Sequence, residues 1–190
     1  MINKKILPRK FYQRNTVTVA KDLIGKILVR NINGKILSGM ITETEAYCGE
    51  VDPASHSYRN KTIRNKALFE VEGHAYIYFT YGNHFCLNAV AKDKNHMSGG
   101  VLIRAIYPLE AIAEMQKNRH IKNLKTLTNG PGKLTQALKI TKELYGIDLT
   151  KQGELFICDS VNKNNYQILV SPRIGIKQAV DYPWRFHIKI

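Results

Sequence analysis

The sequence predicts an α+β fold, a single domain over residues 1–190 built around a mainly antiparallel β-sheet. Apolar and β-branched runs dominate residues 26–47 and 75–107 and return after residue 154. Helical patterns are scattered between these runs, without the regular alternation that a parallel sheet requires. No segment rich in proline, glycine or serine divides the 190 residues, and an apolar share of 44% suits one sizeable core.

Strand patterns dominate the first half of the chain. The runs at 26–32 and 35–47 flank Asn33 and Gly34, a pair typical of a two-residue hairpin turn. Three further aromatic and β-branched runs are separated by glycine-containing breaks, so we expect neighbouring antiparallel strands. These runs are residues 75–82, 84–91 and 100–107.

Helices interrupt the strands, and strands return at the end. Residues 19–25 form a helical pattern that Gly25 would cap, and a second pattern starts at Pro108 and continues to His120. A third helix is expected over residues 133–140. The last strands are expected at 154–160, 166–171, 173–177 and 184–190.

Basic residues greatly outnumber acidic ones. The chain has 29 lysines and arginines against 15 aspartates and glutamates, and the net charge of +14 favours a phosphate-rich partner, above all nucleic acid. An anionic membrane is the second candidate, but no apolar run approaches the roughly 18 residues of a spanning helix. Residues 1–10 lack the apolar core of a signal peptide, so we expect a soluble cytoplasmic protein that does not bind membranes.

The positive charge is clustered in two segments. No acidic residue lies between Asp52 and Glu70 or between Met115 and Lys142, while both segments are rich in lysine and arginine. We interpret them as phosphate-facing surfaces, with a solvated basic exterior as the alternative. Their basic residues include Arg59, Lys61, Arg64, Lys66 and Lys133.

Cysteine and histidine spacing does not predict a metal site. Cys48, Cys86 and Cys158 form no CxxC pair and cannot all be bridged to one another, so we expect buried, reduced thiols. No second histidine stands at metal-ligand spacing from His56. We therefore expect neither a zinc knuckle nor a disulfide framework.

Two glutamates and an arginine are the main candidates for chemistry. In the segment ITETEAY, a two-residue period places Ile41, Glu43, Glu45 and Tyr47 on one face of a strand. If that face points inward, the carboxylates need partners. Arg104, which is centred in an apolar run, would then form an ion pair with a carboxylate such as that of Glu45. The alternative is an exposed edge strand with solvated acids.

Aromatic and polar residues of the next strands are candidates for recognising a base. Tyr76, Tyr78 and Tyr81 lie close together, and tyrosine rings stack on nucleobases or wedge into duplexes, although in strands they are also ordinary packing residues. Tyr81 precedes a glycine at the expected hairpin tip, where a buried role is harder to arrange. Asn88, among apolar residues, must form a hydrogen bond, and His56 is either structural or part of a site.

Several motifs, taken in order, resemble the alkyladenine (3-methyladenine) DNA glycosylase family. The resemblance runs from about Phe11 to Lys189. The motifs are ETEAY at 43–47, DPASHS at 52–57, YxxYG at 78–82, FCLN at 85–88, LIRA at 102–105 and GPGKL at 130–134.

The resemblance implies a compact α+β domain around a curved antiparallel sheet, with a projecting β-hairpin that inserts into DNA. It implies a monomeric, monofunctional enzyme, without metal or cofactor, that flips damaged purines out of double-stranded DNA and hydrolyses the N-glycosidic bond. The lesions implied are 3-methyladenine, 7-methylguanine, hypoxanthine and ethenoadenine.

The same resemblance implies catalytic roles. Glu45 matches the general base that deprotonates the attacking water, and Arg104 matches the arginine that holds this water and the glutamate. Ile174 falls where a backbone carbonyl contacts the water. Neutral lesions also need a proton on the leaving base, for which water and Glu43 are the two candidates.

Pocket residues are implied in the same way. Tyr47, His56 and Tyr78 match residues that line the pocket for the flipped base, with the two tyrosine rings against its faces. Asn88 matches an asparagine that crowds the exocyclic amino group of normal guanine.

The resemblance also implies contacts with DNA. Tyr81 matches the side chain inserted where the nucleotide has left, while Asn83 and His84 replace larger, less polar neighbours. We expect Asn83, His84, Arg64 and Lys133 to contact the duplex.

Three other classes compete with this interpretation. A binder of damaged or single-stranded nucleic acid would use the tyrosines and basic surface alone and would keep its activity in Glu45→Gln. A glycosylase with lyase activity requires an amine nucleophile, but no lysine occurs in the matched pocket motifs, so we expect borohydride trapping on DNA to fail. A sugar hydrolase is disfavoured because Glu43 and Glu45 lie on one strand rather than across a scissile bond.

Overall fold

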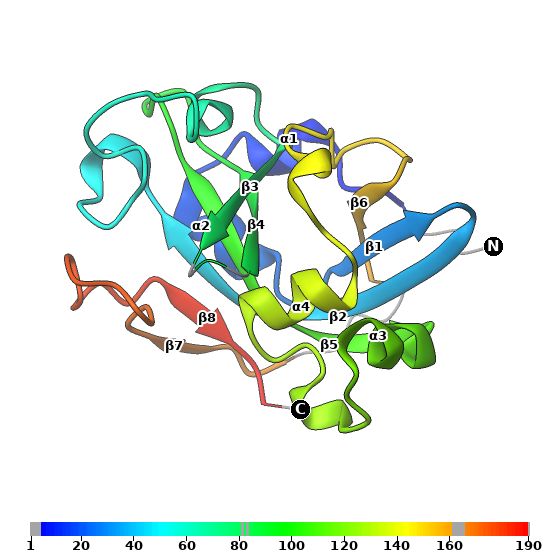
Figure 1. Ribbon diagram of the computed structural model, residues 1–190. Coiled ribbons are helices and arrows are strands. Elements are labelled where there is room, and N and C mark those ends of the chain that lie inside the picture. The colour runs from blue at the N-terminus through cyan, green and yellow to red at the C-terminus, as the bar shows by residue number, and fades with distance from the viewer. Residues whose placement is uncertain (1–4, 81, 83, 161–165, 190) are drawn as a thin grey trace.

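The computed structural model describes residues 5–80, 82, 84–160 and 166–189, and eight strands in this part form one antiparallel sheet (Figure 1). The strands are β1 (Ile27–Ile32), β2 (Lys35–Tyr47), β3 (Ala75–Thr80), β4 (His84–Val90), β5 (Gly100–Glu110), β6 (Leu155–Cys158), β7 (Leu169–Ser171) and β8 (Arg185–His187). Their order is β3-β4-β5-β2-β1-β6, and β8 pairs with both β2 and β7. The predicted α+β class and the antiparallel sheet are confirmed.

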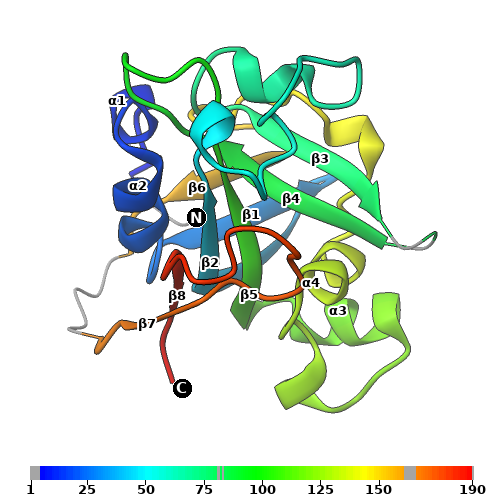
Figure 2. The ribbon, with the colours of Figure 1, turned by 90° about the vertical axis from the view of Figure 1, so that its left-hand side faces the viewer.

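Short helices flank the sheet. The α-helices are α1 (Arg9–Tyr12), α2 (Thr16–Asp22), α3 (Ile112–Arg119) and α4 (Pro131–Ala137), and the 3-10 turns are η1 (Gly49–Val51), η2 (Lys66–Phe69), η3 (Leu124–Thr126) and η4 (Lys142–Leu144). Helix α2 packs against β2 and β5, whereas α4 packs against β4, β5 and α3 (Figure 2). Val19 of α2 and Leu134 of α4 are both fully buried in the same main core.

Strand β2 changes partner along one edge, and this change curves the sheet around it. Residues 35–40 pair with β1, residues 43–45 pair with β8, and β5 follows the other edge. The register against β5 shifts on both sides of Glu43, as at a β-bulge. Ile41 therefore lies in the main core together with Ala46. The prediction that Ile41 shares a face with Glu45 is wrong, because the irregularity offsets the two-residue period.

The predicted hairpin of β1 and β2 is confirmed. Asn33 and Gly34 join β1 to β2 with φ values of 50° and 87°, which suit a type I′ turn. The three expected runs form β3, β4 and β5, neighbours in the sheet. The tip of the β3–β4 hairpin includes Tyr81 and Asn83, which lie outside the described residues.

Three predicted elements differ in the structure. Pro108 does not start a helix: it stays in β5 opposite Gly39, and α3 begins only after Ala111. Residues 173–177 form a loop rather than a strand. Helix α2 starts earlier than expected because the side chain of Asn15 caps it at the N–H groups of Val17 and Thr18.

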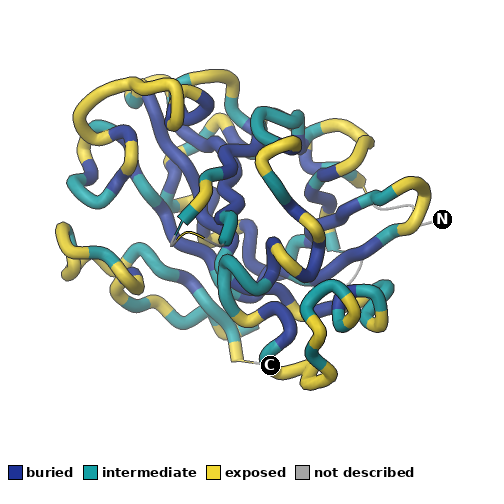
Figure 3. The backbone as a smooth tube through the Cα atoms, viewed as in Figure 1, coloured by how far each residue is buried: buried dark blue, intermediate teal, exposed yellow. Residues whose placement is uncertain are grey.

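Burial follows the strands. Figure 3 shows buried backbone through the centre of the sheet and exposed backbone in the surrounding loops. Cys48, Cys86 and Cys158 are all buried thiols, as the sequence predicted. None of the helices in the described part of the chain combines the length and apolar character that spanning a bilayer requires.

Candidate active site

One face of four neighbouring strands carries a row of residues that includes three predicted candidates, Tyr76, Asn88 and Glu45. Tyr76 of β3 lies opposite Asn88 of β4, Asn88 opposite Leu102 of β5, and Leu102 opposite Glu45 of β2. Residues directly opposite in a sheet share a face, so these four form one row. The alternating residues point into the main core, among them Ala46, Ile77, Leu87 and Ile103. Strands that look uniformly apolar thus have two distinct faces.

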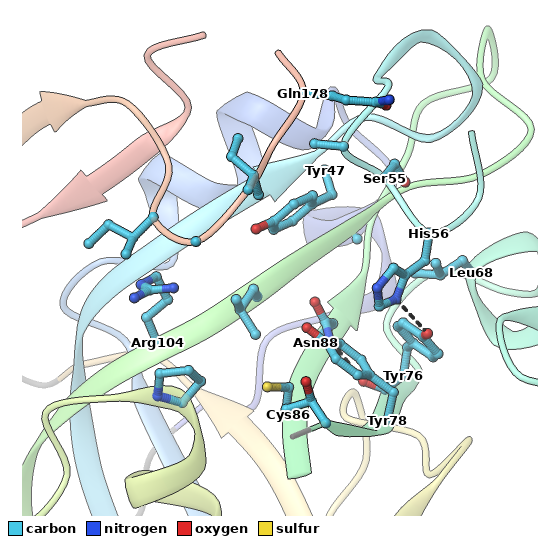
Figure 4. Close-up of a pocket in the computed structure, with 18 of the residues that line it drawn as sticks. Tyr47, Ser55, His56, Leu68, Tyr76, Tyr78, Cys86, Asn88, Arg104 and Gln178 are labelled. Carbon is cyan, nitrogen blue, oxygen red and sulfur yellow. Dashed lines mark hydrogen bonds between the residues drawn. The ribbon is translucent and has the colours of Figure 1, made fainter. Parts of the chain in front are cut away.

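A pocket of about 420 Å³ opens on this face, a size ordinary for small-molecule sites (Figure 4). It is lined from four strands, from the loop that contains His56 and from the loop that follows Arg173. The structure brings seven of the predicted site residues together here, namely Tyr47, His56, Arg64, Tyr78, Asn88, Arg104 and Ile174.

Glu45 lies behind this lining, with no exposed surface, and both its oxygens accept hydrogen bonds. The backbone N–H of Ile174 donates to Oε1 at 2.8 Å. The hydroxyl of Tyr47 donates to Oε2 at 2.8 Å, and Nη1 of Arg104 to the same oxygen at 3.3 Å. These donors replace lost hydration and fix the plane of the carboxylate. The predicted pairing of Arg104 with Glu45 is present.

Glu43 has closer cationic partners than Glu45. Its Oε1 accepts from Nε of Arg104 at 2.8 Å and from Nε of Arg185 at 2.6 Å. Burial acts to raise the pKa of Glu43, but the hydrogen bonds and charges of Arg185 and Arg104 outweigh burial and hold it below its ordinary value. Glu43 is therefore ionised near neutral pH and is poorly suited to be a general acid.

The pocket tyrosines are protonated phenols. Burial raises the pKa of Tyr47, and the neighbouring Glu45 charge raises it further. Burial likewise raises the pKa of Tyr78, and the interaction with Cys86 raises it further. The Tyr78 ring stacks on Tyr76 with centroids 5.4 Å apart, and Tyr76 is only 2% exposed. The ordinary packing role therefore fits Tyr76, although both rings form part of the pocket lining.

His56 is held as a neutral imidazole at the pocket edge. Its Nδ1 lies 2.9 Å from the hydroxyl of Tyr76, and its ring centroid lies 4.6 Å from that of Tyr78. Burial lowers the pKa of His56, and the positive charge of Arg64 lowers it further. Nδ2 of Asn65 donates to the carbonyl of His56 at 2.8 Å, so the backbone is fixed as well.

Asn88 forms the hydrogen bond that the sequence required. Its Nδ2 donates to the carbonyl of Tyr76 at 3.2 Å, which orients the side chain within the lining. Among the described residues, no group of three or more His, Cys, Asp and Glu side chains is arranged to hold a metal ion.

The predicted DNA-contacting residues divide into three groups. Arg64 is exposed, and its Nη2 donates to the carbonyl of Phe79 at 3.0 Å, beside the pocket. His84 starts β4 and packs against Gly132 of α4, while Lys133 is half-buried on the same helix and donates to Oδ1 of Asn129. Tyr81 and Asn83 lie outside the described residues.

Asp52 and Arg173 form a buried contact that the sequence analysis missed. Residues 53–59, which follow Asp52, form turns. The carboxylate of Asp52 accepts from the N–H groups of Cys48 and Ala54, each at 3.1 Å, and pairs with Arg173. Arg173 lacks the signal that singled out Arg104, because it follows Ser171 and Pro172 instead of standing within an apolar run.

Comparison with known proteins gives a consistent result over nearly the whole chain. The family model described as Methylpurine-DNA glycosylase (MPG) matches residues 10–190. A relative from Clostridium perfringens, named "Putative 3-methyladenine DNA glycosylase", is 47% identical, with 96% of this chain and 95% of that protein covered. Proteins of the same name from Carboxydothermus hydrogenoformans and Natranaerobius thermophilus are 46% and 45% identical, covering 97% and 96% of this chain and 95% of each relative. The family resemblance read from the motifs is confirmed.

Proposed function

Because the chain belongs to the methylpurine-DNA glycosylase family and is a DNA glycosylase, we propose that it flips damaged purines from duplex DNA and hydrolyses the N-glycosidic bond with a water activated by Glu45. The observation that carries the proposal is the environment of Glu45. A carboxylate without exposed surface, held through both oxygens, adjoins an aromatic pocket. Excision of this kind starts base excision repair.

The position of Glu45 suits two tasks in this reaction. Breaking the N-glycosidic bond makes the sugar cationic in an oxocarbenium-like state, which a nearby carboxylate stabilises. The same carboxylate takes a proton from the attacking water as the C–O bond forms and the base leaves with the bonding electrons. Arg104, bound to both Glu43 and Glu45, orients the carboxylate and the water.

The pocket supports recognition of a flipped purine. Tyr47 and Tyr78 offer ring faces, and such faces attract the positive charge of 3-methyladenine and 7-methylguanine. His56 is held neutral, so it adds no positive charge that would repel these cationic bases. Asn88 crowds the amino group of normal guanine. Hypoxanthine and ethenoadenine are the neutral substrates of the same pocket, and water supplies the leaving-group proton because Glu43 is ion-paired.

Capture of the lesion depends on the hairpin and on positive charge. Tyr81 fills the space that the flipped nucleotide vacates, which offsets part of the few kcal/mol that flipping costs. Asn83, His84, Arg64 and Lys133 contact the duplex around it, and the net charge of +14 makes binding strongly dependent on salt. The protein acts as a monomer on damaged double-stranded DNA.

A direct assay tests this function. Duplexes with one 7-methylguanine, hypoxanthine or ethenoadenine are incubated with excess protein, and alkali then cleaves any abasic site. We expect abasic sites on at least one of these duplexes. Binding without any abasic site would instead support the non-enzymatic binder.

A lyase activity is the second candidate, because Lys177, which carries a primary amine, is among the residues that line the pocket. Borohydride would trap a Schiff base between such an amine and the sugar. We expect no trapped adduct. An adduct formed by the wild type but lost in Lys177→Ala would establish the lyase in place of the monofunctional reaction.

A further inference from the structure

A buried ion pair lies next to the Glu45 site. The side chains of Arg173 and Asp52 have no exposed surface, and two contacts join them, Nη1 to Oδ2 at 2.5 Å and Nη2 to Oδ1 at 2.8 Å. Burying two charges costs desolvation free energy, and well-packed apolar residues often give equal stability. The pair therefore calls for an explanation other than stability alone, and its contacts supply one.

The pair joins three segments that surround the pocket. Nη1 of Arg173 also donates to the carbonyl of Ala46, the residue between Glu45 and Tyr47, at 2.9 Å. The carboxylate of Asp52 accepts from the N–H groups of Cys48 and Ala54, which fixes the chain that leads to His56. A planar guanidinium that binds a carboxylate through two nitrogens fixes both direction and distance.

Arg173 supports the donors to both oxygens of Glu45. The next residue, Ile174, donates its N–H to Oε1 at 2.8 Å. On the other side, Cζ of Arg173 lies 4.7 Å from the ring centroid of Tyr47, whose hydroxyl donates to Oε2. A second ring, that of Trp184, lies 5.1 Å from the same carbon, so the guanidinium is confined between aromatic groups.

We propose that Arg173 and Asp52 are positioning residues that hold the Glu45 carboxylate in its reactive orientation through Ile174 and Tyr47. The inference rests on the proposed role of Glu45 as the base. The Arg173–Asp52 ion pair then affects the rate of bond cleavage much more than the affinity for DNA. Small errors in the placement of a reacting group lower rates strongly, which gives the effect its expected size.

Two conservative variants test the proposal. Arg173→Lys keeps the positive charge but loses the two-nitrogen contact, and Asp52→Asn keeps the shape but loses the charge. For each we expect the single-turnover rate of 7-methylguanine excision to fall about 10- to 100-fold, while the Kd for the lesion duplex changes less than about threefold. Wild-type rates in both folded variants would overturn the proposal, provided that Glu45→Gln is inactive.

Arg30 offers a matched control. It is the other buried arginine of the described residues, and it contacts Glu154 and the carbonyl of Asn31 on β1. Arg30→Lys removes a comparable buried guanidinium and should keep the wild-type rate. Melting temperatures of the three variants identify any that fail to fold. If Arg173→Lys fails to fold, Asp52→Asn, which replaces only one carboxylate oxygen by an amide nitrogen, still tests the proposal.

Combination with Glu45→Gln separates positioning from general damage. If Arg173 acts through Glu45, Arg173→Lys should not lower the small residual rate of Glu45→Gln any further. A further loss equal to that in the wild-type background would overturn the positioning role while leaving the function of Glu45 intact. If Glu45→Gln itself kept the full rate, the proposed role of Glu45 would fail, and this inference with it.

Discussion

The hydroxyl of Tyr47 donates a hydrogen bond to Oε2 of Glu45 at 2.8 Å, so an aromatic wall of the pocket and the buried carboxylate form one unit. Burial and the charge of Glu45 both raise the pKa of Tyr47, which keeps the phenol protonated at neutral pH and well above it. Tyr47, which we propose to contact the flipped base, would therefore also orient the carboxylate that we propose to activate water.

Removing only this hydroxyl should slow the chemistry. In Tyr47→Phe the ring remains, but Glu45 loses a donor worth about 1.5–3 kcal/mol when its partner is charged, so the single-turnover rate should fall about 10-fold or more. Tyr107→Phe removes a hydroxyl from a tyrosine that is 48% exposed and should have no effect. Equal rates for the wild type and Tyr47→Phe would show that the hydrogen bond does not assist catalysis.

His56 should titrate below the ordinary histidine value of 6.5, because burial and the charge of Arg64 both disfavour the imidazolium. As the pH falls below 6.5, His56 therefore binds a proton more readily in the unfolded chain than in the folded protein. Its protonation then lowers the free energy of unfolding. NMR of the imidazole measures the midpoint directly. Arg64→Gln should move it upward, and a midpoint at or above 6.5 in the wild type would refute the assignment.

Helix α4 supports the base of the β3–β4 hairpin through a glycine. A Cβ on Gly132 would lie 2.8 Å from Cγ of His84, and the hydroxyl of Thr135 donates to the carbonyl of Phe85 at 2.9 Å. Gly132→Ala should therefore displace the start of β4 and weaken binding to lesion duplexes. Gly153→Ala, where no atom lies within 4 Å of the added Cβ, is the control. Equal Kd values for the two variants would exclude this supporting role.

Tyr81 should affect capture of the lesion more than bond cleavage. If its ring replaces the flipped nucleotide in the stack, Tyr81→Ala should raise the Kd for lesion duplexes and lower the rate at limiting protein, with a smaller effect at saturation. Fluorescence anisotropy and single-turnover assays measure the two quantities. Unchanged affinity together with unchanged excision would show that Tyr81 is not the inserted residue.

Much of the fold and part of the site could be predicted because their signals are local. The Asn33–Gly34 turn fixes the first hairpin, and polar residues inside apolar strands marked Arg104 and Asn88. Each of these two side chains does form a hydrogen bond within the pocket group. For Arg104 and Asn88 the local pattern was sufficient, because their hydrogen-bond partners lie on strands of the same sheet.

Other features depend on contacts that no local pattern contains. Arg173 and Asp52 are separated by 121 residues, so no local pattern pairs their side chains. Ile41 lies on the core face because β2 shifts register near Glu43, where β8 joins its edge. Proline is common at the start of helices, but the pairing of β5 with β2 extends the strand past Pro108.

The most direct test of the central claim compares two glutamates of one strand, since Glu43 and Glu45 both bind Arg104. The single-turnover rate is measured on one lesion duplex at saturating protein for the wild type, Glu45→Gln and Glu43→Gln. Glu45→Gln should lose about 100-fold or more, as expected for loss of a general base, while Glu43→Gln should stay within about 10-fold of the wild type. A Glu45→Gln rate close to that of the wild type, or an equal loss in both variants, would contradict the assignment of Glu45 as the group that activates water.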